Sequence, residues 1–575
     1  MARSVALVTP FAWSLPHDVN EHVDGLAREL RARGHQVTVL APSNRARDLA
    51  AGRRALAHGR REDFVAVGPA LPRIGVPVGV RANLAVALAD GRFDVVHGFE
   101  PGLPSISYLA LRDAKALTVA TFLSADRLAY PPARSRRERL LGRLDALLAT
   151  GSDVADAARE RFPGDYELVP LGVELDLFAT TTKRTVVVLE WRQAERPLLR
   201  ALARELEAHP DWELILLRTR ATGARPVLPR ALRGRVRART AADGRARAEI
   251  LRDASIFVPA FDGAGRVLAE ARAAGAAVVA PPGATQEPEL FAAELGRLLD
   301  DASFREKRAA EGHELAERES FAALADRVES VYGAVTARRR VSPAKQPLDD
   351  REWIVVDLHM HTNWSHDCSM DVDELIAHAE SEGLGAIAIT DHNVFGGALE
   401  TVELARGRPL VVVPGEEIKT DRDGEVIGLF LREEIPRGMS FADTVAAIRE
   451  QEGVVYVPHP FDRMHAIPAP ATLHGHLPEI DVLEVYNARL LFEAYNDEAL
   501  RFARKYGLLQ GAGSDAHVLP GVGTGGLRMR RFDGPEEFLV SLRTATVLRR
   551  PKSLAYLQSL KWVAQARERL APSPR

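Results

Sequence analysis

Residues 355–367 read Val-Val-Asp-Leu-His-Met-His-Thr-Asn-Trp-Ser-His-Asp, and this stretch decides how the C-terminal part of the chain folds. The apolar run from Ile354 to Val356 indicates the end of a buried strand. His359 and His361 follow two residues apart, so on an extended backbone their side chains point to the same side. Two imidazoles on one face can bind one metal ion, and Asp367 follows as an oxygen ligand. Taken by itself, the stretch is equally compatible with a partly exposed strand that carries two histidines by chance.

Four more short apolar runs in this region are followed by His, Asp or Glu, the residue types that commonly bind metal ions. They are 386–390 before Asp391-His392, 410–414 before Glu416-Glu417, 454–458 before His459, and 510–513 before Asp515 and His517. Enzymes built as a barrel of alternating strands and helices place their chemistry at the C-terminal ends of the strands. Five strands with this arrangement therefore predict a site for more than one metal ion.

Residues 354 to about 550 resemble the PHP family, named for polymerase and histidinol phosphatase. The motifs that carry the resemblance come in the family's order and are Asp357-Leu-His-Met-His-Thr362, Ser365-His-Asp367, Thr390-Asp-His392, Gly415-Glu-Glu417, His459-Pro460 and Gly513-Ser-Asp-Ala-His517. The resemblance implies a distorted seven-stranded α/β barrel that hydrolyses phosphate esters with two or three divalent metal ions. Mixed imidazole and carboxylate ligands suit Zn²⁺, Mn²⁺ or Fe²⁺.

The resemblance also implies which residues bind these ions. One ion would take His359, His361, Glu417 and Asp515, a second would share Glu417 and add His459, and a third would take Asp367, His392 and His517. Of these, Asp515, Glu417 and His392 are predicted to act in catalysis. Many members of the family have a further His in the strand after the Gly-X-Glu motif, and here the aligned position is Ile427, which cannot be a ligand. The second ion is therefore expected to be bound more weakly, or with water or substrate completing its coordination.

The predicted reaction is the hydrolysis of a small-molecule phosphate ester by a hydroxide formed from metal-bound water. Glu417 is expected to bridge two ions, so that no Ser or Cys nucleophile is required. Arg463 and Arg489 follow two of the apolar strands and are candidates for binding the substrate phosphate. Because the chain is rich in arginine, both are equally well explained as surface residues.

The chain has 575 residues, too many for one hydrophobic core. Its formal charge of −3 argues against a nucleic-acid partner without excluding one. A single cysteine rules out an intramolecular disulfide. We expect neither a membrane span nor a signal peptide, because the apolar runs are too short for either, and we therefore expect a cytoplasmic location.

The remaining sequence alternates strand and helix patterns and predicts two tandem Rossmann-like units, each with a doubly wound parallel sheet. The expected domains are residues 1–178, residues 179–337, a Pro- and Arg-containing linker at 338–352, and the barrel at 353–575. The whole chain is thus predicted to be of the α/β class.

Three stretches of the two Rossmann-like units form a recognisable pattern: His22-Val-Asp-Gly-Leu-Ala-Arg-Glu-Leu30 with Arg33-Gly-His35, Val169-Pro-Leu-Gly-Val-Glu-Leu-Asp-Leu-Phe178, and Leu268-Ala-Glu270 with Ala274-Gly275. On these stretches the two units resemble the GT-B glycosyltransferases, in particular the retaining, family 4-like transferases that use sugar nucleotides. The resemblance implies a sugar-nucleotide ligand and a donor site that contains Arg196, Asp262 and Glu270. Two departures stand against activity: His17-Asp18 replaces the family's Gly-Gly pair, and Trp191 replaces an Arg.

Three hypotheses remain open at this point. The first is a metal-dependent phosphoesterase that carries a degenerate glycosyltransferase-like module. The second is a sugar-nucleotide glycosyltransferase whose barrel is accessory. The third is a non-catalytic, ligand-binding assembly in which metal only stabilises the barrel. Phosphate release from model esters separates the first hypothesis from the third, and transfer or hydrolysis of a sugar nucleotide tests the second.

Overall fold

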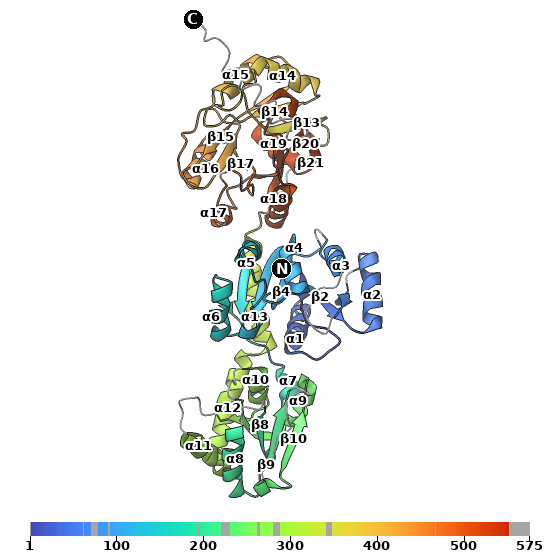
Figure 1. Ribbon diagram of the computed structural model, residues 1–575, viewed down its shortest axis with the longest axis vertical. Helices are drawn as coiled ribbons and strands as arrows, with labels where there is room; N and C mark the ends of the chain where they lie inside the picture. The colour runs from blue at the N-terminus through green and yellow to red at the C-terminus, as the bar shows by residue number, and fades with distance from the viewer. Residues whose placement is uncertain are drawn as a thin grey trace. The chain divides into compact units, whose positions relative to one another are not determined.

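The computed structural model describes residues 2–60, 62–70, 79–89, 92–180, 182–191, 196–219, 230–260, 265–279, 288–340, 348–465 and 467–550. The chain forms two compact units, Met1–Thr336 and Ala337–Arg575 (Figure 1). Three expected features fall outside the described residues: Asp262, the linker segment 341–347, and the last part of the expected barrel domain, residues 551–575. The finer division of the N-terminal unit at residue 178 stays a prediction.

The N-terminal unit begins with a seven-stranded parallel sheet in the order β3-β2-β1-β4-β5-β6-β7. Its strands are β1 (Ser4–Val8), β2 (Gln36–Ser43), β3 (Phe64–Pro69), β4 (Val95–Phe99), β5 (Leu117–Phe122), β6 (Ala146–Ala149) and β7 (Tyr166–Leu168). Its helices are α1 (Asp18–Ala32), α2 (Ala46–Ala57), α3 (Val80–Ala87), α4 (Ile106–Asp113), α5 (Arg134–Leu141) and α6 (Ser152–Arg161). Helix α1 buries residues at helical spacing, from Val19 to Leu30, as its sequence predicted.

A second, five-stranded parallel sheet follows in the order β10-β9-β8-β11-β12. Its strands are β8 (Arg184–Glu190), β9 (Glu213–Arg218), β10 (Val236–Thr240), β11 (Ala254–Val258) and β12 (Ala277–Val278). The helices are α7 (Leu175–Phe178), α8 (Arg196–Glu207), α9 (Gly244–Leu251), α10 (Arg266–Ala273), α11 (Pro288–Asp300), α12 (Ala302–Arg318) and α13 (Phe321–Ala337). Helix α13 returns to the first sheet, where the Tyr332 hydroxyl lies 2.8 Å from His97 Nδ1.

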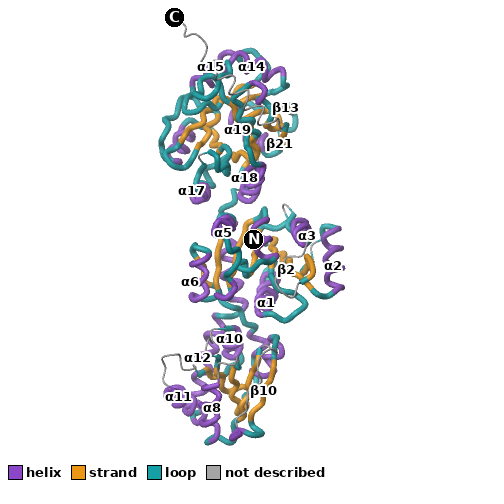
Figure 2. Tube along the Cα trace, in the orientation of Figure 1, coloured by secondary structure: helices purple, strands orange, loops and turns teal. Residues whose placement is uncertain are grey.

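The C-terminal unit contains one nine-stranded sheet in the order β19-β18-β17-β16-β15-β14-β13-β20-β21, enclosed by helices (Figure 2). The strands are β13 (Trp353–Met360), β14 (Ala386–Ile389), β15 (Val411–Lys419), β16 (Glu425–Leu429), β17 (Val454–Val457), β18 (Val482–Asn487), β19 (Leu509–Gly513), β20 (Gly525–Arg530) and β21 (Thr546–Arg549). The helices are α14 (Val372–Ser381), α15 (Gly396–Leu404), α16 (Phe441–Glu450), α17 (Pro470–Gly475), α18 (Glu493–Tyr506) and α19 (Gly534–Leu542).

Strands β13 to β19 are neighbours in chain order, and this run is the predicted seven-stranded barrel. Strand β16 runs antiparallel to both of its neighbours, while the other adjacent pairs in the run are parallel. The two outer strands of the run approach each other where Met360 pairs with Ala516 and the Asp515 N–H donates to the His359 carbonyl at 2.7 Å. Gly513 permits this approach, because a Cβ at that position would lie 2.3 Å from His359 Cβ. The sheet therefore curls into a nearly closed barrel, and β20 and β21 extend it beyond β13.

The surface and the helices give two further observations. No helix in the described part of the chain has the length and apolar character needed to cross a lipid bilayer.

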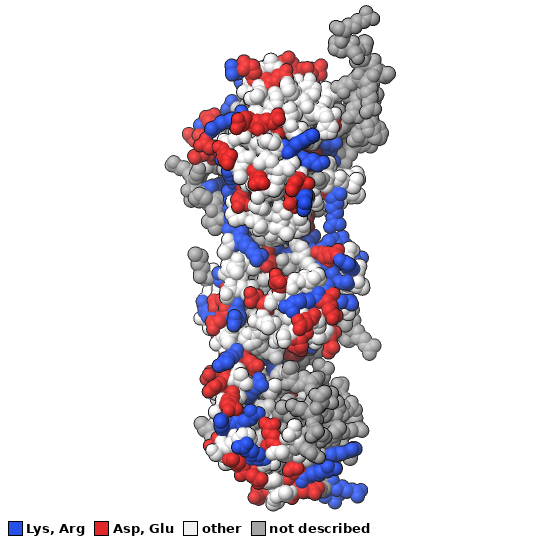
Figure 3. Space-filling view, turned by 90° about the vertical axis from the view of Figure 1, so that its left-hand side faces the viewer, with Lys and Arg blue, Asp and Glu red and all other residues white. Residues whose placement is uncertain are grey.

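On the face drawn in Figure 3, Lys and Arg side chains are interspersed with Asp and Glu. Among the described residues of that face, we therefore see no broad basic surface of the kind that binds a nucleic-acid backbone.

Candidate metal centre

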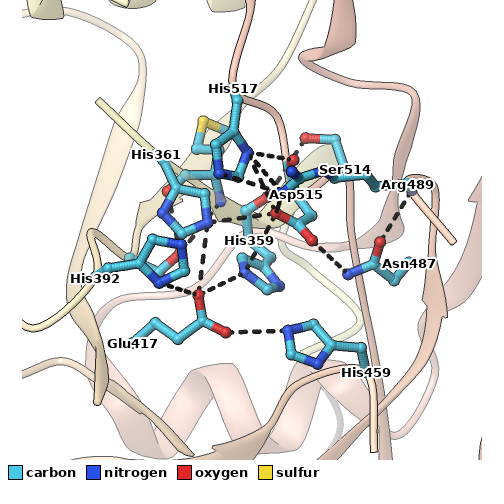
Figure 4. A network of polar contacts seen from close by, with 12 residues as sticks. His359, His361, His392, Glu417, His459, Asn487, Arg489, Ser514, Asp515 and His517 are labelled. Carbon is cyan, nitrogen blue, oxygen red and sulfur yellow. Dashed lines mark hydrogen bonds and ion pairs between the residues drawn. The ribbon is translucent and has the colours of Figure 1, made fainter. Parts of the chain in front are cut away.

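The predicted ligands meet at the end of the barrel where most of its strands terminate (Figure 4). His359 is near the C-terminal end of β13, and His361 follows that strand directly. Glu417 lies on β15, close to the end of that strand. The remaining ligands that Figure 4 labels follow β14, β17 and β19 and are His392, His459, Asp515 and His517. Polar residues at the ends of several buried apolar strands thus meet at one place.

Three non-glycine residues at these strand ends have positive φ angles. The values are 55° at Asn393, 25° at His459 and 51° at Asp515. Such conformations cost about 1–3 kcal/mol each and persist where the surrounding structure enforces them, often at active sites. Two of the three are predicted ligands, so the backbone is strained at the residues that the site uses.

Glu417 is the centre of the cluster. Its Oε2 atom lies 3.1 Å from His392 Nδ1, 3.4 Å from His359 Nε2 and 3.6 Å from His361 Nε2. Its Oε1 atom lies 3.1 Å from His459 Nε2. Burial alone would raise the pKa of Glu417, but the His359 and His392 imidazoles outweigh it and hold the pKa well below its usual value. The two oxygens of one buried carboxylate thus face different histidines, as a bridging ligand requires.

Asp515 lies against the first pair of histidines. Its Oδ1 atom is 3.4 Å from His361 Nε2 and 3.9 Å from His359 Nε2. Asn487 donates to Oδ2 at 3.3 Å, and Arg489 Nη1 lies 3.1 Å from Oδ1. Burial would raise the pKa of Asp515, but Arg489 and His359 outweigh it and keep the pKa well below the usual range. The carboxylate is therefore ionised, and its contacts with Asn487 and Arg489 fix its orientation.

A third group of donors forms around Asp367. His517 Nε2 lies 2.9 Å from Asp367 Oδ2, and His392 Nε2 lies 3.7 Å from Asp367 Oδ1. The His361 ring lies between the groups, with its centroid 4.3 Å from those of both His392 and His517. The structure thus brings together all eight predicted ligands.

The donor set fits divalent metal ions. Three sets of three donors have ligand atoms within 4.8 Å of one another: His359, His361 and Asp515; His359, Glu417 and His459; and His361, His392 and His517. Among the described residues, His361 Nε2 is buried without a hydrogen-bond partner. Burial, together with the neighbouring His517 and His392 rings, lowers the pKa of His361 well below its usual value. This imidazole is therefore neutral, which is the form that binds metals.

The sequence-based prediction missed Glu425, at the start of β16. Ile427, which we aligned with the family's extra ligand, packs in the barrel core. Glu425 is two residues earlier, on the same side of the strand. Its Oε2 atom lies 3.8 Å from His459 Nε2, and Glu425, Glu417 and His392 form a fourth set of donors within 4.8 Å of one another. Burial and the Glu417 charge raise its pKa. The residue of β16 that faces the cluster is thus a carboxylate, two positions before Ile427.

Glu484, in the middle of β18, is a second residue that the prediction missed. Its Oε1 atom lies 3.1 Å from His359 Nδ1 and accepts a hydrogen bond from the Tyr456 hydroxyl at 3.0 Å. Its Oε2 atom accepts from the His459 N–H at 2.7 Å. A carboxylate on Nδ1 fixes the ring so that Nε2 points into the cluster. The signal was present in the sequence as an acid inside the apolar run 482–486.

The two arginines proposed as phosphate ligands lie in different surroundings. Arg489 reaches the cluster, where its Nη1 atom is 3.1 Å from both Asp515 Oδ1 and His517 Nδ1. Arg463 is exposed in the loop after β17. The structure therefore places only Arg489 against the predicted ligands.

In the N-terminal unit, the predicted donor-site residue Glu270 is buried and already paired. Arg247 donates to it through Nε at 2.5 Å and Nη2 at 2.6 Å. Arg247 also donates to Glu21 at 2.6 Å. Trp191 is buried in a hydrophobic core. The side chain of Arg196, which begins α8, is outside the described part of the structure.

At the position of the family's Gly-Gly pair, both side chains have partners. The His17 ring accepts a hydrogen bond from the Val19 N–H at 3.2 Å and stacks on Phe11. Asp18 forms an ion pair with Arg127 at 3.1 Å. Both side chains thus belong to a local network at the start of α1.

Comparison with known proteins identifies both parts of the chain. Residues 19–177 match the Glycosyltransferase Family 4 model, residues 357–503 the PHP domain model and residues 493–547 the PHP-associated model. A phosphatidyl-myo-inositol mannosyltransferase of Mycolicibacterium smegmatis is 30% identical over 334 residues, 52% of this chain and 81% of that protein. An uncharacterised protein of Methanocaldococcus jannaschii is 34% identical over 202 residues, 33% of this chain and 80% of that protein. A solved glycosyltransferase from Rickettsia africae aligns with 58% of this chain and 98% of its own at 15% identity, with a TM-score of 0.41.

Proposed function

Because the chain belongs to glycosyltransferase family 4 in its N-terminal unit and to the PHP-domain proteins in its C-terminal unit, we propose that it is a metal-dependent phosphoesterase. The proposed substrate is a small-molecule phosphate ester. The observation that carries the proposal is Glu417, whose two carboxylate oxygens face three buried histidines and the partly buried His392 at one end of the barrel. Buried histidines and carboxylates that converge in this way are typical of hydrolytic metal centres.

The donor groups suggest ligand sets for three ions. His359, His361 and Asp515 would hold one ion. His459 and Glu425 would hold a second, and Glu417 lies where it could serve both. Asp367, His392 and His517 would hold a third. When bound, Zn²⁺, Mn²⁺ or Fe²⁺ would acidify a water molecule and polarise a phosphoryl oxygen. Glu484 and Ser365 hold the rings of His359 and His361 in place.

We assign the binding of a phosphate oxygen to Arg489. Its guanidinium touches Asp515 and His517 at the edge of the cluster, while 29% of its side chain remains exposed. A guanidinium presents several N–H donors in one plane, so contact with Asp515 leaves donors for an anionic oxygen. Arg463 remains a weaker candidate for the same role.

A phosphatase screen on the purified full chain tests this proposal. With Mn²⁺, Zn²⁺ or Fe²⁺ added, we expect release of inorganic phosphate from at least one class of small phosphate monoester, and loss of that release after chelation. If no ester is hydrolysed although the protein is folded and saturated with metal, the non-catalytic hypothesis is favoured instead.

Substitution of Glu425 tests the ligand assignment on β16. Glu425→Gln keeps the size of the side chain but removes its charge, so we expect the affinity for one ion to fall by at least about tenfold. Glu425→His supplies the ligand type usual in the family and is expected to retain that ion. Competition against a chelator, read by elemental analysis, measures both variants. Glu403→Gln, an exposed residue on α15, is the matched control. Equal metal affinity in Glu425→Gln and wild type would remove Glu425 from the site.

A second candidate function, sugar-nucleotide transfer, is favoured by the match to most of the mannosyltransferase. The buried pairing of Glu270 with Arg247 opposes it, because the guanidinium already occupies part of the carboxylate's hydrogen-bonding capacity. We therefore expect sugar nucleotides to bind more weakly than about 1 mM. Titration calorimetry with the full chain measures this. A micromolar dissociation constant that is lost in Glu270→Ala would establish a functional donor site and favour the transferase.

A further inference from the structure

Arg489 places a positive charge against two of the proposed metal ligands. Its Nη1 atom lies 3.1 Å from Asp515 Oδ1. The same atom lies 3.1 Å from His517 Nδ1 and 3.2 Å from His517 Nε2. A guanidinium has only N–H donors and stays charged throughout the physiological pH range. The cluster therefore contains a permanent cation within contact distance of both ring nitrogens of His517.

The backbone that carries this guanidinium is anchored at the end of β18. The Arg489 N–H donates to Asn487 Oδ1 at 2.9 Å, and the Asn487 side chain donates to Glu484 at 3.0 Å. Asn496, on α18, accepts a hydrogen bond from the Asn487 N–H at 3.0 Å. Both asparagines are buried. Buried contacts thus hold the residue from which the guanidinium reaches the ligands.

The three proposed ligand sets differ in how deeply they are buried. In the set of Asp367, His392 and His517, the first two side chains are 24% and 18% exposed. Glu425 of the second set is 15% exposed, whereas the two histidines and Asp515 of the first set are at most 3% exposed. The third set is therefore the one most open to water, and an ion exchanges with the solvent most easily there.

The guanidinium and an ion bound to His517 repel each other. A bond between a metal ion and an imidazole nitrogen is about 2.0–2.1 Å long, so an ion on either nitrogen of His517 would lie near the Arg489 charge. At the effective dielectric constant near a protein surface, charges this close change an affinity by about tenfold or more. Asp515 offsets part of this repulsion, but its Oδ1 atom also faces His361 of the first set.

We propose that Arg489 lowers the affinity of the third set, Asp367, His392 and His517, for a divalent ion, so that occupancy of this set follows the concentration of free metal. This inference rests on the metal centre of the phosphoesterase proposed above and describes how that centre is regulated. The two more deeply buried sets fill at lower metal concentrations. Turnover rises only when the third set fills as well.

The substitution Arg489→Met tests the inference, because it removes the charge and keeps a long side chain. We expect this variant to bind its weakest ion about tenfold to a hundredfold more tightly than the wild type does. Titration of Mn²⁺ into the purified full chain in competition with a chelator measures the affinities. After free metal is removed, elemental analysis should find one more ion per chain in the variant. A lower affinity in the variant would overturn the inference, because Arg489 would then support the site.

Two further variants serve as controls. Arg489→Lys keeps the positive charge and should bind metal as the wild type does. Arg406→Met removes an exposed arginine just after α15 and should also leave the affinities unchanged. An equal gain in affinity in Arg406→Met would show a general effect of net charge and would contradict the inference.

A double-mutant cycle with His517 locates the effect. His517→Ala removes a ligand of the third set and should lose one ion. In that background, Arg489→Met should not change the affinities that remain. If it still raises them by the same factor, the charge acts on the whole cluster and the assignment to the third set is wrong. His392→Ala, at the more exposed side of the same set, replaces His517→Ala in the cycle if circular dichroism shows that the latter is unfolded.

Metal affinity and phosphate release together separate this inference from the proposed activity. If Arg489→Met binds its weakest ion more tightly but the wild type hydrolyses no ester at any metal concentration, the role of Arg489 stands and the phosphoesterase proposal fails. If the wild type hydrolyses esters and its turnover is already maximal when the two buried sets are filled, the phosphoesterase proposal stands and the regulation fails. If the wild type binds no metal, both fail.

Discussion

Replacing His359 and His361 together with alanine is expected to remove most of the bound transition metal and to lower phosphatase turnover by at least about a thousandfold. The Nε2 atoms of both rings face Glu417 and Asp515. Both rings are fully buried, so exposed side chains cannot replace them at that position. A divalent ion supplies several kcal/mol of charge stabilisation in the transition state, and each 1.36 kcal/mol is a factor of ten in rate.

The metal-to-protein ratio by elemental analysis and the rate of phosphate release measure this result together. Circular dichroism must show that the variant is folded, because the substitution leaves buried carboxylates without their histidine partners. A double substitution of His378 and His476, which are partly exposed and contact none of the proposed ligands, provides a control of the same size. If the folded double variant retains the wild-type metal content, the proposed centre is wrong.

Asp515→Asn is expected to lower turnover by at least about a hundredfold while changing KM only modestly. The substitution keeps the size of the side chain and leaves an oxygen that can accept from Asn487 or Arg489. It removes the negative charge that faces His359 and His361, and amides bind metals less well than carboxylates do. An effect on turnover with little effect on KM is the signature of an interaction that matters in the transition state.

A pH–rate profile at saturating metal tests this prediction. Arg489 and His359 hold the pKa of Asp515 well below its usual value, so the carboxylate is ionised at neutral pH and loses its charge only in acid below the normal range. The deficit of the variant should therefore be present throughout the profile between pH 5 and pH 9, as a pKa below about 3.9 requires. Asp497→Asn, at an exposed position on α18, is the control. Wild-type turnover in Asp515→Asn would exclude Asp515 as a catalytic ligand.

Much of the barrel could be predicted because several of its strands are short apolar runs that end in a polar residue. The spacing of two between His359 and His361 was sufficient to place both rings on one side, and the structure shows them there. Local sequence carries this information, since the direction of a side chain on a strand depends only on whether its position is odd or even.

Glu425 and Glu484 could not be assigned in the same way. Glu425 begins a strand that pairs antiparallel with β15, where Glu425 lies opposite Lys419. Its approach to His459 therefore depends on the register of two strands, which the local pattern does not specify. Glu484 interrupts an apolar run, but the sequence does not say that the Tyr456 hydroxyl donates a hydrogen bond to it or that it lies against His359 Nδ1.

The N-terminal unit shows the same limit. The departures at His17-Asp18 and Trp191 could be read from the sequence, but the partner of Glu270 could not. Arg245 and Arg247 both lie in the first turn of α9, and only the folded structure shows that Arg247 reaches the carboxylate. A buried ion pair between two helices depends on how those helices pack, and the sequence of either helix alone does not determine that.

The junction between β13 and β19 has a consequence for how the protein matures. Ser514 and His359 are 155 residues apart in the chain, yet they meet at this junction, and the proposed metal ligands lie on both sides of it. During synthesis, the histidine pair emerges from the ribosome long before Asp515 and His517. A nascent chain therefore cannot assemble the full donor set until almost the whole C-terminal unit has been made. Metal binding by the proposed centre is thereby coupled to completion of the barrel, and products truncated before Asp515 lack part of the donor set.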